Sequence, residues 1–277
     1  MILIYRTAEG IAACIDGDWR LIELLNGCID SLINLAHPDL IRKISSASPQ
    51  IDPLDPTRIL APIGSQEVWA AGVTYYRSRD ARMEESKESG GQDFYAKVYT
   101  ADRPELFFKA NAQRVVGHFG EVRIRQDSRW NVPEPELVLV INSKGRIVGY
   151  TIGNDISSRD IEGENPLYLP QAKVYDGSCA IGPCILMRET DLPIETHILM
   201  SIVRSGAVAY SGETDLTQLK RTPEDLVSYL FREISFPKGA MLLTGTGIIP
   251  GTDFSLQSGD VVNISIGQIG TLTNTVA

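Results

Sequence analysis

Residues 134–155, EPELVLVINSKGRIVGYTIGND, combine two apolar strand patterns with acidic residues at either end. Residues 136–142 are almost continuously apolar, Lys144-Gly145 is a turn dipeptide, and residues 147–152 form a second apolar run. Short apolar runs separated by turn residues are typical of buried strands. We therefore expect two buried strands here, with carboxylates where the first begins and the second ends.

Strand patterns dominate the rest of the chain as well. Residues 1–25 are expected to form short strands, followed by helices at residues 28–36 and 39–46. After residue 123 the chain again has mostly strand patterns. Because strands and helices do not alternate regularly, we predict an α+β protein, mostly β, with a mixed sheet curled on itself.

One helix interrupts the C-terminal strands. Thr222 is a suitable cap and Pro223 fits the first helical position. The expected buried stripe of this helix is Leu226, Leu230 and Ile234.

Proline content indicates where the chain divides. Residues 46–64 contain four prolines and are expected to form an extended linker. We therefore predict a small N-terminal α+β domain at residues 1–60 and a main domain at residues 61–277. Residues 77–97 are the most charged and least apolar stretch, which fits either a solvated insertion or a mobile lid.

Composition excludes several classes of protein. The 277 residues carry a net charge of −9, with 43% apolar and 22% charged residues. An acidic chain without clustered Lys and Arg is not expected to bind nucleic acid. No apolar run is long enough for a membrane span, and no secretory signal is visible. We expect a cytoplasmic globular protein without a membrane partner.

Three carboxylates are the strongest candidates for chemistry. Glu134 and Glu136 flank Pro135, so in an extended chain both side chains point to one face. Alone, this pattern also fits solvated surface, but Asp155 follows at the end of the next strand. Three carboxylates without clustered His or Cys favour a hard divalent cation: Mg²⁺, or alternatively Mn²⁺ or Ca²⁺.

Three other residues suit such a site. Lys173 is either an ordinary exposed lysine or an ammonium that stabilises an enolate. Thr246 lies in a Gly-rich run that lacks the pattern of a nucleotide-binding loop, and its hydroxyl can hold a substrate carboxylate. His118, in a loop before the acidic strand, is either an acid–base residue or a loop histidine without a catalytic role.

Together these segments resemble the fumarylacetoacetate hydrolase superfamily. The resemblance rests on residues 134–173, on GSCAIGP and on LLTGTGIIPG, and it covers the chain from about residue 68 onward. The segments RPELFFKA, VVGHFG and ENPLYLPQAK are most similar to the branch that dehydrates 2-keto-3-deoxy sugar acids. The resemblance implies a mixed β-roll core that binds one divalent cation, usually Mg²⁺.

The resemblance also implies a role for individual residues. The implied metal ligands are Glu134, Glu136 and Asp155, the implied catalytic lysine is Lys173, and the implied substrate contacts are Thr246, Tyr75 and Arg79. Glu105, in RPELFFKA, matches a carboxylate near the substrate in the dehydratases and is the expected base. The implied assembly is a homodimer or homotetramer, and the implied partner is a small 2-oxo acid.

The lid entrance departs from the hydrolase pattern. Hydrolases of the superfamily carry a His–Glu pair there that activates water, whereas this chain has Ser78 and Ala81 at those positions. Without that base, elimination fits better than hydrolysis. The resemblance to the dehydratase branch then implies an Mg-dependent dehydratase that converts a 2-keto-3-deoxy sugar acid, such as 2-keto-3-deoxyarabinonate, to 2,5-dioxopentanoate and water. The alternatives are an acylpyruvate-type C–C hydrolase or decarboxylase, and an inactive binding scaffold.

Overall fold

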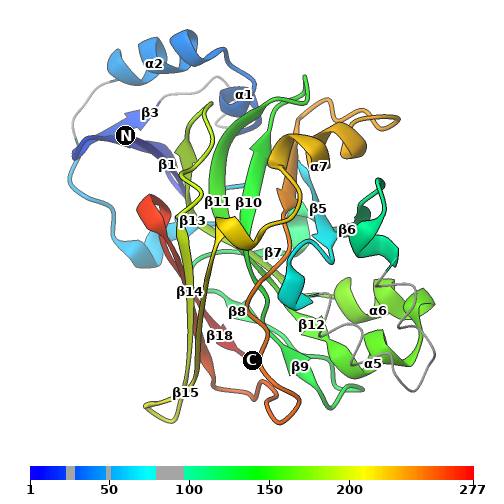
Figure 1. Ribbon diagram of the computed structural model, residues 1–277. Helices are drawn as coiled ribbons and strands as arrows, with labels where there is room; N and C mark the ends of the chain where they lie inside the picture. The colour runs from blue at the N-terminus through cyan, green and yellow to red at the C-terminus, as the bar shows by residue number, and fades with distance from the viewer. Residues whose placement is uncertain (23–28, 48–50, 79–96) are drawn as a thin grey trace.

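The computed structural model describes residues 1–22, 29–47, 51–78 and 97–277, and it confirms a mostly β fold with mixed sheets. The central sheet has eleven strands (Figure 1). In order across the sheet these are β3 (Asp18–Ile22), β2 (Gly10–Ile15), β1 (Ile2–Thr7), β13 (Cys179–Met187), β11 (Ile147–Asp155), β10 (Pro135–Ile141), β16 (Ala240–Leu243), β5 (Glu67–Gly72) and β6 (Glu105–Asn111), with β4 (Ile59–Leu60) beside β1 and β7 (Val115–Val116) beside β13. Most neighbours are antiparallel, whereas β16–β5 and β13–β7 are parallel.

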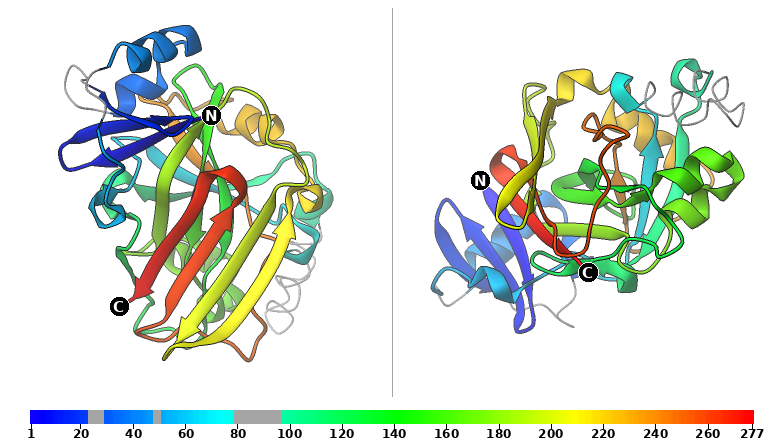
Figure 2. Two further views of the ribbon diagram at one scale, coloured as in Figure 1. Left: turned by 90° about the vertical axis from the view of Figure 1, so that its left-hand side faces the viewer. Right: turned by 90° about the horizontal axis from the view of Figure 1, so that it is seen from below.

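A five-stranded sheet packs against the central sheet, and Figure 2 shows it facing the viewer in the left-hand view. Its strands in order are β15 (Ala207–Asp215), β14 (His197–Arg204), β17 (Val261–Ile266), β18 (Gly270–Val276) and β8 (Glu121–Val122). A separate short ladder joins β9 (Asn131–Val132) to β12 (Ser157–Ser158). The strands expected after residue 123 are therefore confirmed.

The helices are short and lie around the sheets (Figure 1). Those whose bounds both lie within the described residues are α1 (Ile29–Ile33), α2 (His37–Ser45), α5 (Arg159–Glu164), α6 (Leu169–Lys173) and α7 (Pro223–Leu230). The α2 helix begins at His37 rather than at Asp39, because Pro38 is tolerated within a first helical turn.

The N-terminal cap predicted for α7 is confirmed, but the helix is shorter than predicted. The Thr222 side chain accepts a hydrogen bond from the Asp225 backbone N–H at 3.2 Å. The helix ends at Leu230, and Ile234 is 41% exposed, so its assignment to the buried stripe was wrong. Phe236 is buried beyond the helix instead, with its ring 4.8 Å from the Phe231 ring.

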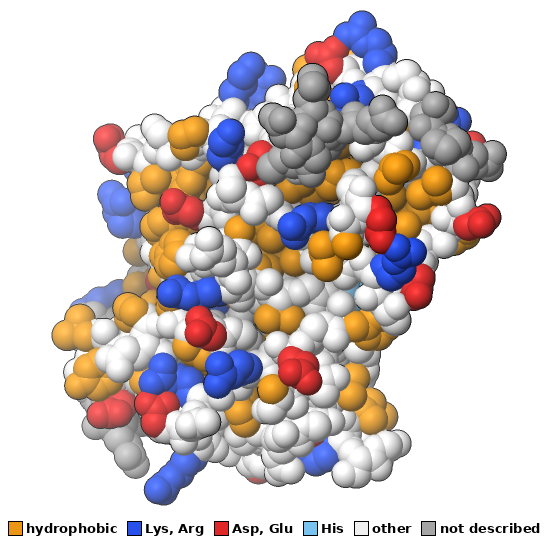
Figure 3. Space-filling view, turned by 180° about the vertical axis from the view of Figure 1, so that it is seen from behind, with side chains coloured by type: hydrophobic (Ala, Val, Ile, Leu, Met, Phe, Trp, Pro, Cys, Tyr) orange, Lys and Arg blue, Asp and Glu red, His pale blue; other side chains and the backbone are white. Residues whose placement is uncertain are grey.

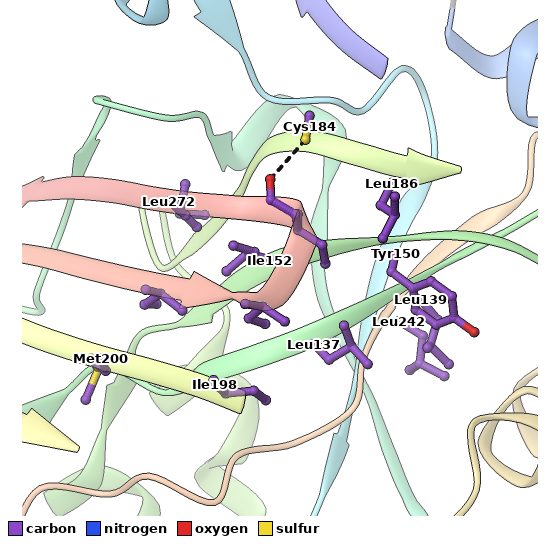
Figure 4. Close-up of a cluster of buried hydrophobic side chains, with 14 of the residues drawn as sticks. Leu137, Leu139, Tyr150, Ile152, Cys184, Leu186, Ile198, Met200, Leu242 and Leu272 are labelled. Atoms are coloured by element: carbon purple, nitrogen blue, oxygen red, sulfur yellow. Dashed lines mark hydrogen bonds between the residues drawn. The ribbon is translucent and has the colours of Figure 1, made fainter. Parts of the chain in front are cut away.

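Two apolar layers lie on opposite faces of the central sheet. Alternate residues of β10 enter different layers, with Leu137 and Leu139 facing the five-stranded sheet and Val138 and Val140 facing the N-terminal helices. Figure 4 shows the first layer, in which side chains from both sheets meet. The acidic residues at the start of β10 continue the Val138 row, so they belong to the second layer.

The N-terminal segment joins the central sheet directly. Strand β1 pairs with β13, and the end of the proline-rich linker adds β4 beside β1. Asp30 of α1 is buried and accepts hydrogen bonds from the Ser65 backbone N–H at 2.9 Å and the Gln66 side chain at 2.6 Å. The division into residues 1–60 and 61–277 remains a prediction.

The surface carries charges of both signs. On the rear face, Lys and Arg side chains lie among Asp and Glu side chains rather than in one basic patch (Figure 3). Among the described residues, no helix has the length and apolar character needed to cross a membrane.

Candidate metal centre

Glu134, Glu136 and Asp155 lie together where β10 begins and β11 ends. These strands are antiparallel, with Glu136 opposite Gly153, so Asp155 emerges two residues further along β11 on the same face. One carboxylate oxygen from each of the three residues lies within 4.8 Å of the other two. Glu134, Glu136 and Asp155 are only 5%, 1% and 1% exposed, so they form an internal cluster of acidic groups.

The electrostatics of Glu136 indicate a site that needs positive charge. Burial raises the pKa of Glu136 well above its usual range, and the neighbouring Asp155 and Glu134 raise this pKa further. The Gly245 backbone N–H donates a hydrogen bond to Glu136 Oε2 and so orients the carboxylate. Three converging buried carboxylates fit a hard divalent cation, which neutralises their mutual repulsion.

Cationic side chains from three different segments surround the carboxylates. Arg159 of α5 forms an ion pair with Glu134, and Lys109 of β6 forms one with Asp155. Lys173, at the end of α6, contacts both Glu134 and Asp155. Isolated buried charges are strongly disfavoured, so these cations stabilise the acidic cluster within the fold.

Lys173 lies at the centre of these contacts and is 1% exposed, which excludes the exposed-lysine interpretation. Its Nζ is 2.8 Å from Glu134 Oε2 and 3.0 Å from Asp155 Oδ2. It also donates a hydrogen bond to Ser157 Oγ at 2.5 Å and lies 5.8 Å from the centre of the Phe107 ring. The Lys173 ammonium is therefore held directly beside two of the three carboxylates.

Glu105 begins β6 and lies opposite Gly72 of β5. A methyl group added at Gly72 would lie 2.1 Å from Glu105 Oε2, so the carboxyl group rests directly on the glycine. Phe107, two residues further along β6, packs near the Lys173 ammonium. Because alternate residues of a strand share a face, Glu105 and Phe107 leave β6 on the same side.

Tyr75 and Thr246 are both linked to Glu136, Tyr75 through the effect of the Glu136 charge and Thr246 through its neighbour Gly245, which donates a hydrogen bond to Glu136. Tyr75 is buried, and burial, followed by the charges of Glu136 and Asp215, raises the pKa of its hydroxyl. Tyr75 also lines a pocket of about 350 Å³ that opens beside Arg77. Thr246 follows Gly245, and its hydroxyl accepts a hydrogen bond from the Ile248 backbone N–H at 3.1 Å.

His118 is not brought to the carboxylates. Its Nδ1 accepts a hydrogen bond from the Thr273 backbone N–H of β18 at 3.1 Å. The His118 backbone also lies near Gly182, which pairs with Ile152 on the face of the sheet opposite to Asp155. Burial lowers the pKa of this histidine, in keeping with a neutral ring held by the backbone.

Arg79, together with most of the expected lid at residues 77–97, lies outside the described residues. Ser78 is described, and its hydroxyl donates to the Tyr75 carbonyl at 2.7 Å and accepts from the Tyr75 N–H at 3.1 Å. It therefore caps the local backbone at the position where hydrolases carry histidine.

Sequence reasoning missed Lys109, Arg159 and Glu162 as members of the cluster. Glu162 is buried, with Oε2 3.8 Å from Arg159 Nη1 and Oε1 3.8 Å from Lys173 Nζ. The only sequence signal for Arg159 was its place in the segment NDISSRD, four residues after Asp155. Lys109 lies in the segment RPELFFKA, but nothing in that segment indicates its partner, which lies 46 residues away in the sequence.

Comparisons with known proteins show what the whole chain is similar to. Residues 74–277 match the family described as fumarylacetoacetate (FAA) hydrolase C-terminal. A probable 2-keto-3-deoxyxylonate dehydratase of Haloferax volcanii is 51% identical over 216 residues, which cover 78% of this chain and 73% of that protein. A 2-dehydro-3-deoxy-D-arabinonate dehydratase of Saccharolobus solfataricus is 46% identical over 221 residues, covering 79% and 74%.

A solved structure is similar over nearly the whole chain. It is a 2-keto-3-deoxy-D-arabinonate dehydratase complexed with magnesium and 2,5-dioxopentanoate. The TM-score is 0.85 and the sequence identity 34%, with 99% of this chain and 98% of that chain covered. The fold around the acidic cluster is therefore shared with an enzyme whose structure contains Mg²⁺.

Proposed function

The chain belongs to the fumarylacetoacetate hydrolase family, and we propose that it is a magnesium-dependent dehydratase of a 2-keto-3-deoxy sugar acid. From 2-keto-3-deoxyarabinonate, the reaction gives 2,5-dioxopentanoate and water. The observation that carries this proposal is the buried convergence of Glu134, Glu136 and Asp155 with Lys173 in direct contact with two of them. Relatives 46–51% identical, both named as dehydratases, support it.

The acidic cluster is the proposed holder of the ion. Glu134, Glu136 and Asp155 each provide one oxygen, which leaves coordination positions for water and substrate. A bound Mg²⁺ supplies a Lewis acid that makes the C3 proton beside a 2-oxo group more acidic. The chain's remaining task is to accept that proton, to stabilise the resulting negative charge and to exclude side reactions.

Two side chains are assigned to the proton and the charge. Glu105 accepts one C3 proton on its carboxylate and returns it to the departing C4 hydroxyl, so one H₂O is lost and a C3–C4 double bond forms. Tautomerisation, in which a proton moves from C5 to C3 and the C5 hydroxyl proton moves to C4, then gives the 2,5-dioxo product. The Lys173 ammonium stabilises the negative charge that develops on the 2-oxo oxygen. Thr246 and Tyr75 are assigned to substrate binding together with Arg79.

The state of Ser78 favours elimination over hydrolysis of a carbon–carbon bond. Hydrolysis requires a base that activates water, and a neutral serine hydroxyl is a poor base. Here that hydroxyl is also occupied by both backbone groups of Tyr75. An elimination needs no attacking water and is compatible with this arrangement.

A substrate comparison tests the proposal. Purified protein with Mg²⁺ is incubated with 2-keto-3-deoxy-D-arabinonate, 2-keto-3-deoxyxylonate or an acylpyruvate, and the products are identified by mass spectrometry. We expect at least one sugar acid to lose water and the acylpyruvate to remain intact. Cleavage of the acylpyruvate with both sugar acids unchanged would contradict the proposal and support the hydrolase alternative.

The organisation of the protein around this site is also proposed. Residues 61–277 form the catalytic domain, residues 77–97 its lid, and residues 1–60 the smaller domain. The active form is a homodimer or homotetramer that works in the cytoplasm. Light scattering on the purified chain measures the assembly, and a monomer would contradict it.

A further inference from the structure

Strand β6 contains a bulge at Lys109. Val68 of β5 pairs with Ala110 of β6, and the next residue, Trp69, pairs with Phe108. Lys109 is therefore passed over in the pairing. Phe107 and Lys109 are two residues apart, so the Lys109 side chain leaves β6 on the same face as Phe107, which lies near the Lys173 ammonium. The Lys109 side chain is fully buried.

The Lys109 ammonium has three partners. It forms an ion pair with Asp155 Oδ1, and it donates hydrogen bonds to the Ile156 carbonyl at 3.2 Å and to the Lys173 carbonyl. Two of the three ammonium donors therefore go to backbone carbonyls, and the contact with Asp155 Oδ1 is an ion pair. Two of the acceptors are backbone groups, which hold the ammonium in place independently of the Asp155 carboxylate.

The contacts of Lys173 are of a different kind. Its ammonium contacts side chains of Glu134, Asp155 and Ser157. Two of these side chains are proposed metal ligands, whose oxygens an incoming ion would have to share. Lys109 instead approaches Asp155 while anchored to the backbone on both sides of the site. Lys173 thus contacts the proposed metal ligands, whereas Lys109 is held by backbone carbonyl groups as well as by Asp155.

We propose that Lys109 is a positioning residue of the metal site. It fixes the orientation of the Asp155 carboxylate through Oδ1 and links the end of β11 to the end of α6, which carries Lys173. This inference rests on the metal site of the proposed function and adds a residue to it. Lys109 acts through Asp155 and does not touch the substrate.

The direction in which Mg²⁺ affinity changes when Lys109 is removed separates a positioning role from a simple charge effect. If Lys109 contributed only its positive charge, removing it would strengthen Mg²⁺ binding, because like charges repel. If it positions Asp155, removing it weakens binding, since loss of a group that orients a metal ligand typically costs about 10- to 100-fold in affinity. The two roles therefore predict opposite changes.

The experiment is calorimetric Mg²⁺ titration of the substrate-free protein and of Lys109→Met. The matched control is Arg204→Met, which removes the cation beside another buried aspartate, Asp260, with two contacts of 2.7 Å. We expect Lys109→Met to raise the Mg²⁺ Kd roughly 10- to 100-fold and Arg204→Met to leave it unchanged. An unchanged or lower Kd for folded Lys109→Met would overturn the proposal.

A measurement on the unmodified protein covers the case in which Lys109→Met does not fold. The ¹⁵N NMR signal of the Lys109 ammonium should show slow proton exchange both with and without Mg²⁺, because its carbonyl partners do not change. Rapid exchange, or a larger Mg²⁺-induced shift for Lys109 than for Lys173, would refute the positioning role. Failure of the unmodified protein to bind Mg²⁺ would instead refute the metal site itself.

Discussion

The two buried layers on either side of the central sheet share the same strands but differ in chemistry. On the face toward the five-stranded sheet, β10 contributes Leu137 and Leu139 to a mostly apolar layer. On the other face, the row that contains Val138 turns acidic at Glu136 and Glu134. Val138 and Glu136 are only two positions apart, yet Val138 packs in an apolar cluster and Glu136 belongs to the proposed metal site.

The comparison shows what each kind of interior requires. The apolar layer needs only side chains of suitable volume, which the strand pattern itself provides. The acidic end needs cations placed within ion-pair distance, and these come from β6, α5 and α6. Removing one partner of a buried ion pair typically costs about 3–5 kcal/mol, so these contacts constrain the fold as well as the site.

The largest effect is expected at the acidic end. Asp155→Asn removes a negatively charged ligand while keeping the shape, and it should lower kcat/KM roughly a thousandfold, because the ion contributes several kcal/mol to transition-state stabilisation. Steady-state kinetics with saturating Mg²⁺ measure this. The control is Asp260→Asn, another buried aspartate with a cationic partner. Equal losses in both variants would mean that the effect is merely structural.

A substitution in the apolar layer should lower stability and leave activity and Mg²⁺ affinity unchanged. Leu139→Ala deletes buried methyl groups and should lower the free energy of unfolding by about 2–5 kcal/mol. Activity per folded molecule and Mg²⁺ affinity should stay unchanged, because the side chain faces away from the carboxylates. Urea denaturation and kinetics on the same preparation measure both quantities. A selective loss of Mg²⁺ affinity would show that the two layers are not independent.

Lys173→Met tests the ammonium that contacts two carboxylates. It should lower kcat about a hundredfold, the usual cost of losing one group that stabilises developing negative charge. By contrast, KM should change little if the lysine acts mainly in the transition state. Lys144→Met, in the exposed hairpin turn between β10 and β11, is the control. If kcat of Lys173→Met equals that of the control, the charge-stabilising role is excluded.

The smallest effect concerns the glycine beneath Glu105. Gly72→Ala introduces a methyl group that displaces the Glu105 carboxylate, so kcat should fall by roughly 10- to 100-fold through misplacement of the base. Glu105→Gln provides the comparison, since it removes the base without moving the strand. If Gly72→Ala retains full activity while Glu105→Gln does not, the glycine is not needed to position the carboxylate.

The sequence was sufficient for features that depend on local patterns. Apolar runs bounded by turns located β10, β11 and the C-terminal strands, and Thr222 with Pro223 located the start of α7. The end of α7 was missed, because Ile234 fits helical spacing although the chain leaves the helix four residues earlier. Helix ends depend on what the next residues pack against, which spacing alone does not contain.

Site residues on adjacent strands could be predicted from the sequence, whereas those that depend on distant segments could not. Convergence of Glu134, Glu136 and Asp155 could be predicted because adjacent antiparallel strands fix which ends meet. The role of Lys109 could not, since it depends on contacts with segments that are distant in the sequence. His118 lies near the acidic strand in the sequence, but its ring is held by β18 on the other face of the sheet.

The central claim is that three carboxylates share one divalent ion. Its most direct test is a crystal structure with Mn²⁺ in place of Mg²⁺, in which anomalous scattering locates the metal. We predict a single peak per chain, bonded at roughly 2.1 Å to one oxygen each of Glu134, Glu136 and Asp155. A peak elsewhere, or no peak at this cluster under saturating Mn²⁺, would contradict the account.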